Sequence, residues 1–185
     1  MSVLSGLNLG WGTRLPMVLQ TEAAECGLAC LVMAAGYHGR PSDLATLRRR
    51  FGMSLKGVNL KDLVTMAERV GFASRAVRLE VDELALLKTP CILHWDLNHF
   101  VVLKKAGSKS ITIHDPGVGV RNMPLAEVRK HFTGVALELT PLGNFESAQP
   151  LPRVRFRALV GHLVGLRRSL GQLLLLALAI EVFAL

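Results

Sequence analysis

The run Gln20-Thr21-Glu22-Ala23-Ala24-Glu25-Cys26-Gly27-Leu28-Ala29-Cys30 places a cysteine at the predicted start of a helix, six residues after a glutamine. A helix N-terminus presents unpaired backbone N–H groups and the positive end of the helix dipole. Both favour the thiolate form of a cysteine over the thiol. Cys26 is therefore a candidate nucleophile, and it needs a base and further polar partners elsewhere in the chain.

The hydrophobic pattern around this run predicts an α+β fold. Apolar residues recur at helical spacing over residues 24–35, 42–51 and 60–70, with Ser42 as the expected N-cap of the second helix and Gly36 ending the first. From residue 73 the period changes, and residues 1–15 have few apolar anchors and are expected to form a loosely held lead-in. Strands are predicted at 73–79, 90–95, 100–104, 110–114 and 135–139, with a helical turn at 81–87 and a short helix at 124–131. Helices followed by an antiparallel sheet are typical of the α+β class.

The C-terminal part of the chain has a different composition. Residues 151–185 contain five arginines and a single acidic residue, Glu181, and residues 169–185 are almost entirely apolar. The mean hydropathy of +0.36 is high for a purely soluble chain. We expect a domain at 1–142, a linker and basic segment at 143–168, and the truncated start of a transmembrane helix at 169–185.

Arginines just before an apolar span predict that the preceding domain faces the cytoplasm. A buried amphipathic helix or a nucleic-acid arm would also explain basic residues near an apolar tail. A nucleic-acid arm is disfavoured because neither interleaved aromatic residues nor a known binding module accompanies the arginines. No nucleic-acid partner is expected.

The three cysteines agree with a reducing compartment. Their number is odd and suggests no framework of disulfides, so a free reactive thiol is easier to accommodate than a disulfide scaffold. No basic segment followed by an apolar core and a cleavage site opens the sequence, and we predict no signal peptide.

Hydrolysis of a peptide bond by a thiol needs an imidazole, a group that orients it, and donors for the developing oxyanion. His99 opens one predicted strand and Asp115 closes the next, so the two side chains can meet on adjacent antiparallel strands. The Gln20 amide lies before the helix and could donate to the oxyanion beside the backbone N–H of Cys26. The order Gln, Cys, His, Asp along the chain is that of papain-like cysteine peptidases.

Each of these residues also has a purely structural interpretation. A cysteine on an apolar helix is more often a core residue than a nucleophile, and we assign Cys30 and Cys91 to the core. Cys26 and Cys30 lie one helical turn apart, but the paired short spacings of zinc sites are missing and no metal is expected. His94 and His114 are rivals of His99 for the role of base, and Asp96 is a rival of Asp115.

Three separated motifs resemble the N-terminal bacteriocin-processing peptidase domain (peptidase family 39) of ATP-binding-cassette exporters of the colicin V secretion type. They are the run from Gln20 to Cys30, the run Leu93-His94-Trp95-Asp96-Leu97-Asn98-His99-Phe100-Val101-Val102-Leu103, and Ile113-His114-Asp115-Pro116. The resemblance covers roughly residues 13–142. It implies a papain-like cysteine peptidase on the cytoplasmic side of the inner membrane, which cleaves leader peptides after a double-glycine motif during export.

Carried over by position, the resemblance implies Cys26 as nucleophile, His99 as general base and acid, Asp115 as orienting group and Gln20 as oxyanion donor. No cofactor is implied for this chain, whereas ATP and Mg²⁺ are implied for the nucleotide-binding domain of the parent transporter. The implied partners are the double-glycine leader peptide, the membrane, the remaining transporter domains as a homodimer, and an accessory export protein. Some relatives lack the cysteine and only dock their cargo, so a non-catalytic leader-binding module is the alternative.

Overall fold

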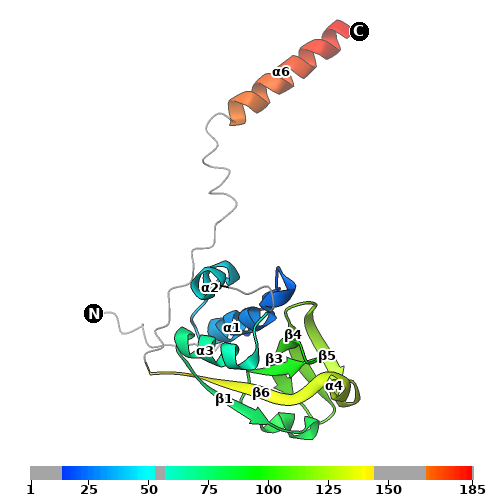
Figure 1. The fold of residues 1–185 in the computed structure, drawn as a ribbon. Coiled ribbons are helices and arrows are strands. Elements are labelled where there is room, and N and C mark those ends of the chain that lie inside the picture. Colours follow the sequence, from blue (N-terminus) through cyan, green and yellow to red (C-terminus); the bar gives the residue numbers. More distant parts are fainter. Residues whose placement is uncertain (1–13, 53–56, 144–165, 185) are drawn as a thin grey trace, which may run out of the picture. The chain divides into compact units, whose positions relative to one another are not determined.

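The computed structural model of the protein describes residues 14–52, 57–143 and 166–184. The chain divides into two units, Met1–Pro150 and Leu151–Leu185. The described part of the first unit begins with three helices, and a sheet with one further helix between its last two strands follows (Figure 1), which confirms the α+β class.

The helical part begins with a short 3-10 turn, η1 (Ala23–Glu25), that leads directly into α1 (Cys26–Tyr37). Cys26 is thus the first residue of α1, although the sequence predicted a helix from Ala24 to Ala35 that Gly36 terminates. Residues 26–35 are all buried, because α1 packs against other elements on every side. An all-apolar helix of this kind has no solvent face.

The two remaining helices of this part are α2 (Leu44–Phe51) and α3 (Leu60–Val70). The N-cap of α2 is Asp43, whose side chain accepts the Thr46 N–H at 2.7 Å, and not Ser42 as predicted. α3 has the predicted bounds. Gly71 ends it with a φ of 106°, a left-handed conformation that glycine adopts without steric cost.

Six antiparallel strands form one sheet in the order β1-β6-β2-β3-β4-β5. Their bounds are β1 (Phe72–Arg78), β2 (Cys91–Trp95), β3 (His99–Ala106), β4 (Ser110–Asp115), β5 (Gly119–Pro124) and β6 (Phe132–Pro141). The sequence analysis missed β5, which pairs with β4 over its whole length. β6 is longer than the strand predicted at 135–139, because it pairs with β1 along one edge and with β2 along the other.

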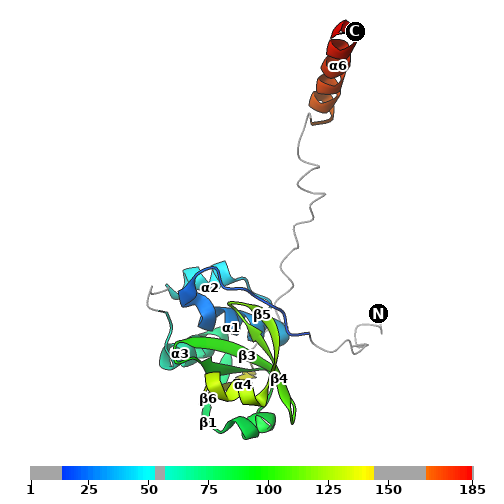
Figure 2. The ribbon, with the colours of Figure 1, turned by 90° about the vertical axis from the view of Figure 1, so that its right-hand side faces the viewer.

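The sheet separates two apolar cores. Helices α1 to α3 cover one face, where Ile92, Phe100 and Val102 of the sheet join their core. The turn η2 (Val81–Leu86) and helix α4 (Leu125–His131) cover the other face (Figures 1 and 2). Leu15 is also buried in the first core. The chain is therefore anchored at Leu15, the last residue of the predicted lead-in, whose residues 1–13 lie outside the described residues.

The second unit contains α6 (Leu166–Ala184), an apolar helix within the predicted tail. Among the residues that the structure describes, no helix is both long and apolar enough to cross a membrane. The predicted start of a transmembrane helix is therefore not confirmed. The predicted linker lies mostly outside the described residues, and the domain boundaries stay predictions.

Candidate active site

Cys26 is held at the start of α1 by a buried carboxylate one residue earlier. Glu25 accepts the backbone N–H groups of Thr21 and Glu22, each at 3.1 Å, and its other oxygen is paired with Arg48 of α2. Burial acts to raise the pKa of Glu25, but the hydrogen bonds from Arg48 and the two backbone groups outweigh it and lower the pKa. An ionised side chain therefore fixes the turn between Gln20 and Cys26.

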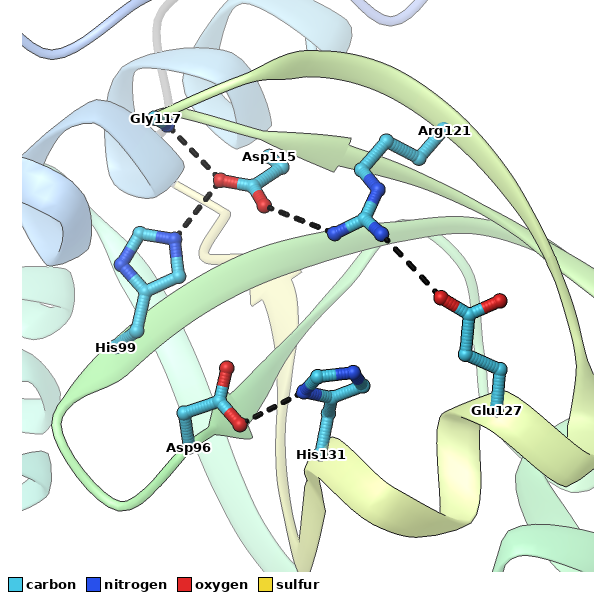
Figure 3. Close-up of polar contacts among 7 residues, drawn as sticks. All are labelled: Asp96, His99, Asp115, Gly117, Arg121, Glu127 and His131. Atoms are coloured by element: carbon cyan, nitrogen blue, oxygen red, sulfur yellow. Dashed lines mark hydrogen bonds and ion pairs between the residues drawn. The ribbon is translucent and has the colours of Figure 1, made fainter.

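His99 and Asp115 meet as the sequence predicted. His99 opens β3, Asp115 closes β4, and the His99 Nε2 lies 2.8 Å from the Asp115 Oδ1 (Figure 3). Cys26 lies close enough to His99 to act on its pKa. Because Nε2 is bonded to the carboxylate, Nδ1 is the ring nitrogen left for the thiol. Cys26, His99 and Asp115 thus lie next to one another in that order, from α1 to β4.

The surroundings favour a charged His99. Burial disfavours the imidazolium, yet the hydrogen bond to Asp115 and the interactions with Cys26 and with the Asp115 charge raise the pKa of His99 to about 9. The pKa of Asp115 moves the other way. Burial alone would raise it, but the hydrogen bonds from His99 and the Gly117 N–H and the charges of His99 and Arg121 lower it. At neutral pH the pair is an imidazolium beside a carboxylate.

The turn after Asp115 brings three polar groups together. The Asp115 Oδ1 accepts the Gly117 N–H at 2.9 Å in addition to its bond with His99. A Cβ atom added to Gly117 would lie 3.4 Å from the Asp115 Oδ1, 3.9 Å from the His99 Cε1 and 4.0 Å from the Gln20 Nε2. Gly117 is thus the point on which the three side chains converge.

Gln20 is attached to the same turn through its backbone. Its N–H donates to the carbonyl oxygen of Pro116 at 2.9 Å. Its side-chain Oε1 is buried and has no hydrogen-bond partner among the described residues. That oxygen therefore does not hold the amide group in a structural contact. The structure thus brings all four predicted residues to one end of the α1–sheet junction.

A groove of about 820 Å³ opens beside Cys26. Its walls come from the turn before α1, from the start of α3 and from the β2–β3 turn, and include Ala24, Gly57, Leu60, Leu97 and Phe100. Leu97 is largely exposed at the tip of that turn. Only 4% of the Cys26 surface is accessible, and Cys26 is one of the residues that line this groove.

The rival residues are engaged elsewhere. Asp96 contacts His131, with 2.8 Å between the Asp96 Oδ1 and the His131 Nδ1 (Figure 3). His94 is bonded to the Thr133 hydroxyl, and His114 is buried with its Nδ1 3.1 Å from the Pro16 carbonyl oxygen. None of the three is hydrogen-bonded to Cys26 or to Asp115 in the contacts just described.

The other two cysteines lie in the apolar cores. Cys30 and Cys91 are fully buried and free, as expected for core residues. Burial raises the pKa of the Cys30 thiol, and electrostatic interactions with the nearby Cys26 and Asp115 raise it further. Cys30 therefore stays a thiol at neutral pH. In the described ranges, no cluster of three or more histidine, cysteine or acidic side chains could hold a metal ion.

The model of the peptidase C39 family matches residues 14–144 of this chain. The chain belongs to this family. The matched C39 region contains the whole of the arrangement around Cys26, His99 and Asp115, and the family is one of cysteine peptidases.

The sequence of this C39 protein is similar to those of transporter-associated processing proteins. It is 44% identical over 183 residues to the colicin V secretion/processing ATP-binding protein of Escherichia coli. This alignment covers 99% of this chain and 26% of that protein. A probable microcin-H47 secretion/processing protein of the same organism is 42% identical with the same coverage. The chain thus spans about a quarter of the length of these relatives.

Solved structures show the same C39 fold. A double glycine motif protease from an AMS/PCAT transporter, crystallised with a leader peptide, superposes with a TM-score of 0.65 at 35% identity. The superposition covers 70% of this chain and 93% of that one. The peptidase domain of Streptococcus ComA gives a TM-score of 0.63 at 26% identity, covering 69% of this chain and 99% of that domain.

Several residues of the C39 site were missed by the sequence analysis. Glu25, Gly117 and Arg121 each contact a predicted site residue or its turn. Glu25 directly precedes Cys26, and Gly117 follows Asp115-Pro116, so both were adjacent to identified motifs. No sequence signal marked Arg121, which reaches Asp115 only through the pairing of β4 with the unpredicted β5.

Proposed function

We propose that this chain is a cysteine endopeptidase that removes double-glycine-type leader peptides from bacteriocin-like cargo. The observation that carries the proposal is the hydrogen bond between His99 and Asp115, with Cys26 near His99 and Gln20 near both members of that pair. We assign Cys26 as nucleophile, His99 as general acid and base, Asp115 as orienting group and Gln20 as oxyanion donor.

In the proposed reaction, the Cys26 thiolate attacks the carbonyl carbon of the peptide bond after the second glycine. The developing oxyanion accepts hydrogen bonds from the Gln20 amide and the Cys26 backbone N–H, each typically contributing about 10²–10³ in rate. His99 then donates the proton on its Nδ1 to the leaving amine, which breaks the peptide bond and leaves a thioester. Neutral His99 takes a proton from water, and the hydroxide releases the leader and regenerates Cys26.

The shape of the groove beside Cys26 supports a preference for glycine. Ala24 and Gly57 are adjacent small residues in its wall, where a Cβ atom on Gly57 would lie 3.8 Å from the Ala24 Cα. A peptide backbone without side chains can approach such walls closely, whereas larger residues at the last two leader positions would clash. Leu60, Leu97 and Phe100 offer an apolar surface for the remainder of the leader, in keeping with helix-in-groove recognition.

The relatives support the same substrate class and an attachment to a transporter. Their names describe secretion and processing by ATP-binding proteins, and one solved relative is a double glycine motif protease bound to a leader peptide. We therefore propose that the domain faces the cytoplasm as part of a homodimeric ABC exporter in the bacterial inner membrane. In that protein ATP and Mg²⁺ would act in the nucleotide-binding domain, and an accessory export protein would complete the assembly.

Incubation of the full chain with a peptide whose leader ends in Gly-Gly tests the assignment. We expect mass spectrometry to detect the free leader and the free cargo. Cys26→Ala should abolish the cleavage, while Cys91→Ala, which changes a core thiol far along the chain from the site, should retain it. Cleavage that survives Cys26→Ala would disprove the proposal.

A non-catalytic leader-binding domain is the alternative, and alkylation distinguishes the two. Iodoacetamide near pH 6 should label Cys26 in preference to Cys30 and Cys91, because an ordinary thiol of pKa about 8.5 is mostly protonated there. Leader binding with neither turnover nor preferential labelling of Cys26 would support the docking domain instead.

A further inference from the structure

The second carboxylate oxygen of Asp115 faces two charged residues to which no catalytic role has been assigned. The Arg121 Nη1 lies 3.9 Å from the Asp115 Oδ2, and the Arg121 Nη2 lies 3.6 Å from the Glu127 Oε1 (Figure 3). Both separations exceed normal hydrogen-bond lengths. The contacts are therefore ion pairs that act through space.

Strand register explains why Arg121 reaches this carboxylate. Arg121 of β5 lies directly opposite Ile113 of β4, two residues before Asp115. Residues two apart on a strand point to the same face, so Arg121 is the diagonal neighbour of Asp115 on that face. Glu127 lies in α4, which follows β5 directly, and it approaches the guanidinium from the other side.

Four charges of alternating sign thus form a row. His99 on β3 is followed by Asp115 on β4, Arg121 on β5 and Glu127 on α4. Among the described residues, the other titratable groups that interact with the first two members are the thiols of α1, Cys26 beside His99 and Cys30 near Asp115. Neither thiol contributes a second positive charge.

We propose that Arg121 and Glu127 are positioning residues for peptide cleavage. Arg121 orients Asp115 through its Oδ2 and opposes the positive charge on His99, while Glu127 holds Arg121 and offsets its charge. The proposal rests on the peptidase function proposed above.

The sign of each effect follows from Coulomb's law. Removal of the Arg121 charge leaves Asp115 uncompensated and favours the imidazolium of His99. Removal of the Glu127 charge strengthens the effect of Arg121 and disfavours the imidazolium. The side chains of Arg121 and Glu127 are 33% and 43% exposed, so solvent screens both charges and we expect shifts of about half a pH unit or less.

The pH dependence of kcat/KM tests this, because its alkaline limb reports the loss of the His99 proton in the free enzyme. With a Gly-Gly leader peptide, Arg121→Gln should move that limb to higher pH by about half a unit. Glu127→Gln should move it to lower pH by a smaller amount, and the double variant should return close to the wild type. Arg121→Lys, which keeps the charge, should leave the limb within about 0.2 units of the wild type.

A merely structural role would lower the rate without opposite shifts. Arg129→Gln is the matched control, since Arg129 lies on α4 like Glu127 but is paired with the exposed Asp82. Arg129→Gln should leave the alkaline limb of kcat/KM at the pH of the wild type. Shifts of the same sign in Arg121→Gln and Glu127→Gln, or no shift in either, would overturn the proposal.

NMR titration of His99 in the full chain separates this proposal from the peptidase function, because it needs no substrate. Opposite shifts of the imidazole titration without any peptide cleavage would uphold the electrostatic coupling of Arg121 and Glu127 to His99 and refute the proposed function. If the wild type cleaves the peptide but the titration of His99 is unshifted in both Arg121→Gln and Glu127→Gln, only the role proposed for Arg121 and Glu127 would be refuted.

Discussion

The nucleophile and its base lie in regions that are held together by different forces. Cys26 begins a helix in which residues 26–35 are all buried, so apolar packing fixes that helix, while Glu25 fixes only the turn before it. His99 lies at a strand end with a side chain 20% exposed, and a row of polar contacts through Asp115 fixes its position. Substitutions behind Cys26 should therefore affect mainly stability, whereas substitutions behind His99 should affect mainly the reaction and its pH dependence.

The largest expected effect is on the reaction. Asp115→Asn keeps the size of the side chain but removes the charge that orients His99, and we expect kcat to fall by about 10²–10⁴. Steady-state kinetics with a Gly-Gly leader peptide measure the change. Asp96→Asn is the matched control, because Asp96 contacts His131 and asparagine tolerates its left-handed φ of 48°. Similar losses in both variants would contradict the difference between the two carboxylates.

A core substitution on the helix side should instead reduce stability. Leu31 of α1 has no exposed surface, and Leu31→Ala should lower the free energy of unfolding by about 2–5 kcal/mol through lost burial and a cavity. Leu86→Ala, at a leucine that is 81% exposed, should change it by less than about 0.5 kcal/mol. Urea denaturation measures both. If Leu31→Ala lowered the free energy of unfolding no more than Leu86→Ala does, the close packing of Leu31 in the core around α1 would be refuted.

The polar side of the site should give the stability a characteristic pH dependence. The pKa of His99 is raised to about 9 from 6.5, so its contribution is fully present below pH 6.5 and is lost as the pH rises towards 9. The pKa of Asp115 is lowered from 3.8, so its contribution is present above that pH and is lost in more acidic solution.

The two contributions overlap between about pH 4 and 6.5, where the pair stabilises the fold most. Urea denaturation at a series of pH values measures the profile. Asp115→Asn should flatten the alkaline decline relative to the wild type, because His99 then loses its charged partner. An unchanged decline in that variant would assign the pH dependence to other groups.

The smallest expected effect concerns an ion pair that serves neither region. Arg129 and Asp82 are 51% and 66% exposed, and such pairs contribute at most about 1 kcal/mol. Arg129→Gln should change the free energy of unfolding by less than about 0.5 kcal/mol and leave kcat unchanged. Thermal denaturation and kinetics together check this. A larger loss would show that α4 depends on this pair.

The contrast between the regions also explains what the sequence could predict. α3 was predicted with its observed bounds because Gly71 ends it and its apolar residues recur at helical spacing. β5 was missed because glycine, asparagine and proline disfavour strands, and its pairing with β4 is set by the preceding turn. Local patterns report local structure, whereas strand pairing depends on the whole sheet.

The same limit applies to the site. The motifs around Cys26, His99 and Asp115 were visible because each occurs within a short run of sequence. Arg48 lies 23 residues from Glu25, and its contact is created by the packing of α2 on the turn before α1. Arg121 reaches Asp115 only across a strand pair. Residues that support a site through tertiary contacts have no signature in the local sequence.

The burial of Cys26 also has an evolutionary consequence. A serine or alanine is close to cysteine in size, so either could replace Cys26 at the start of α1 without disturbing the packing of the helix. The groove beside it would be unchanged, and a single base change is enough to convert a cysteine codon to one for serine. A single substitution could therefore convert a domain that cleaves the leader into one that only binds it. Because the stability of the fold would be retained, selection for stability would not oppose this change.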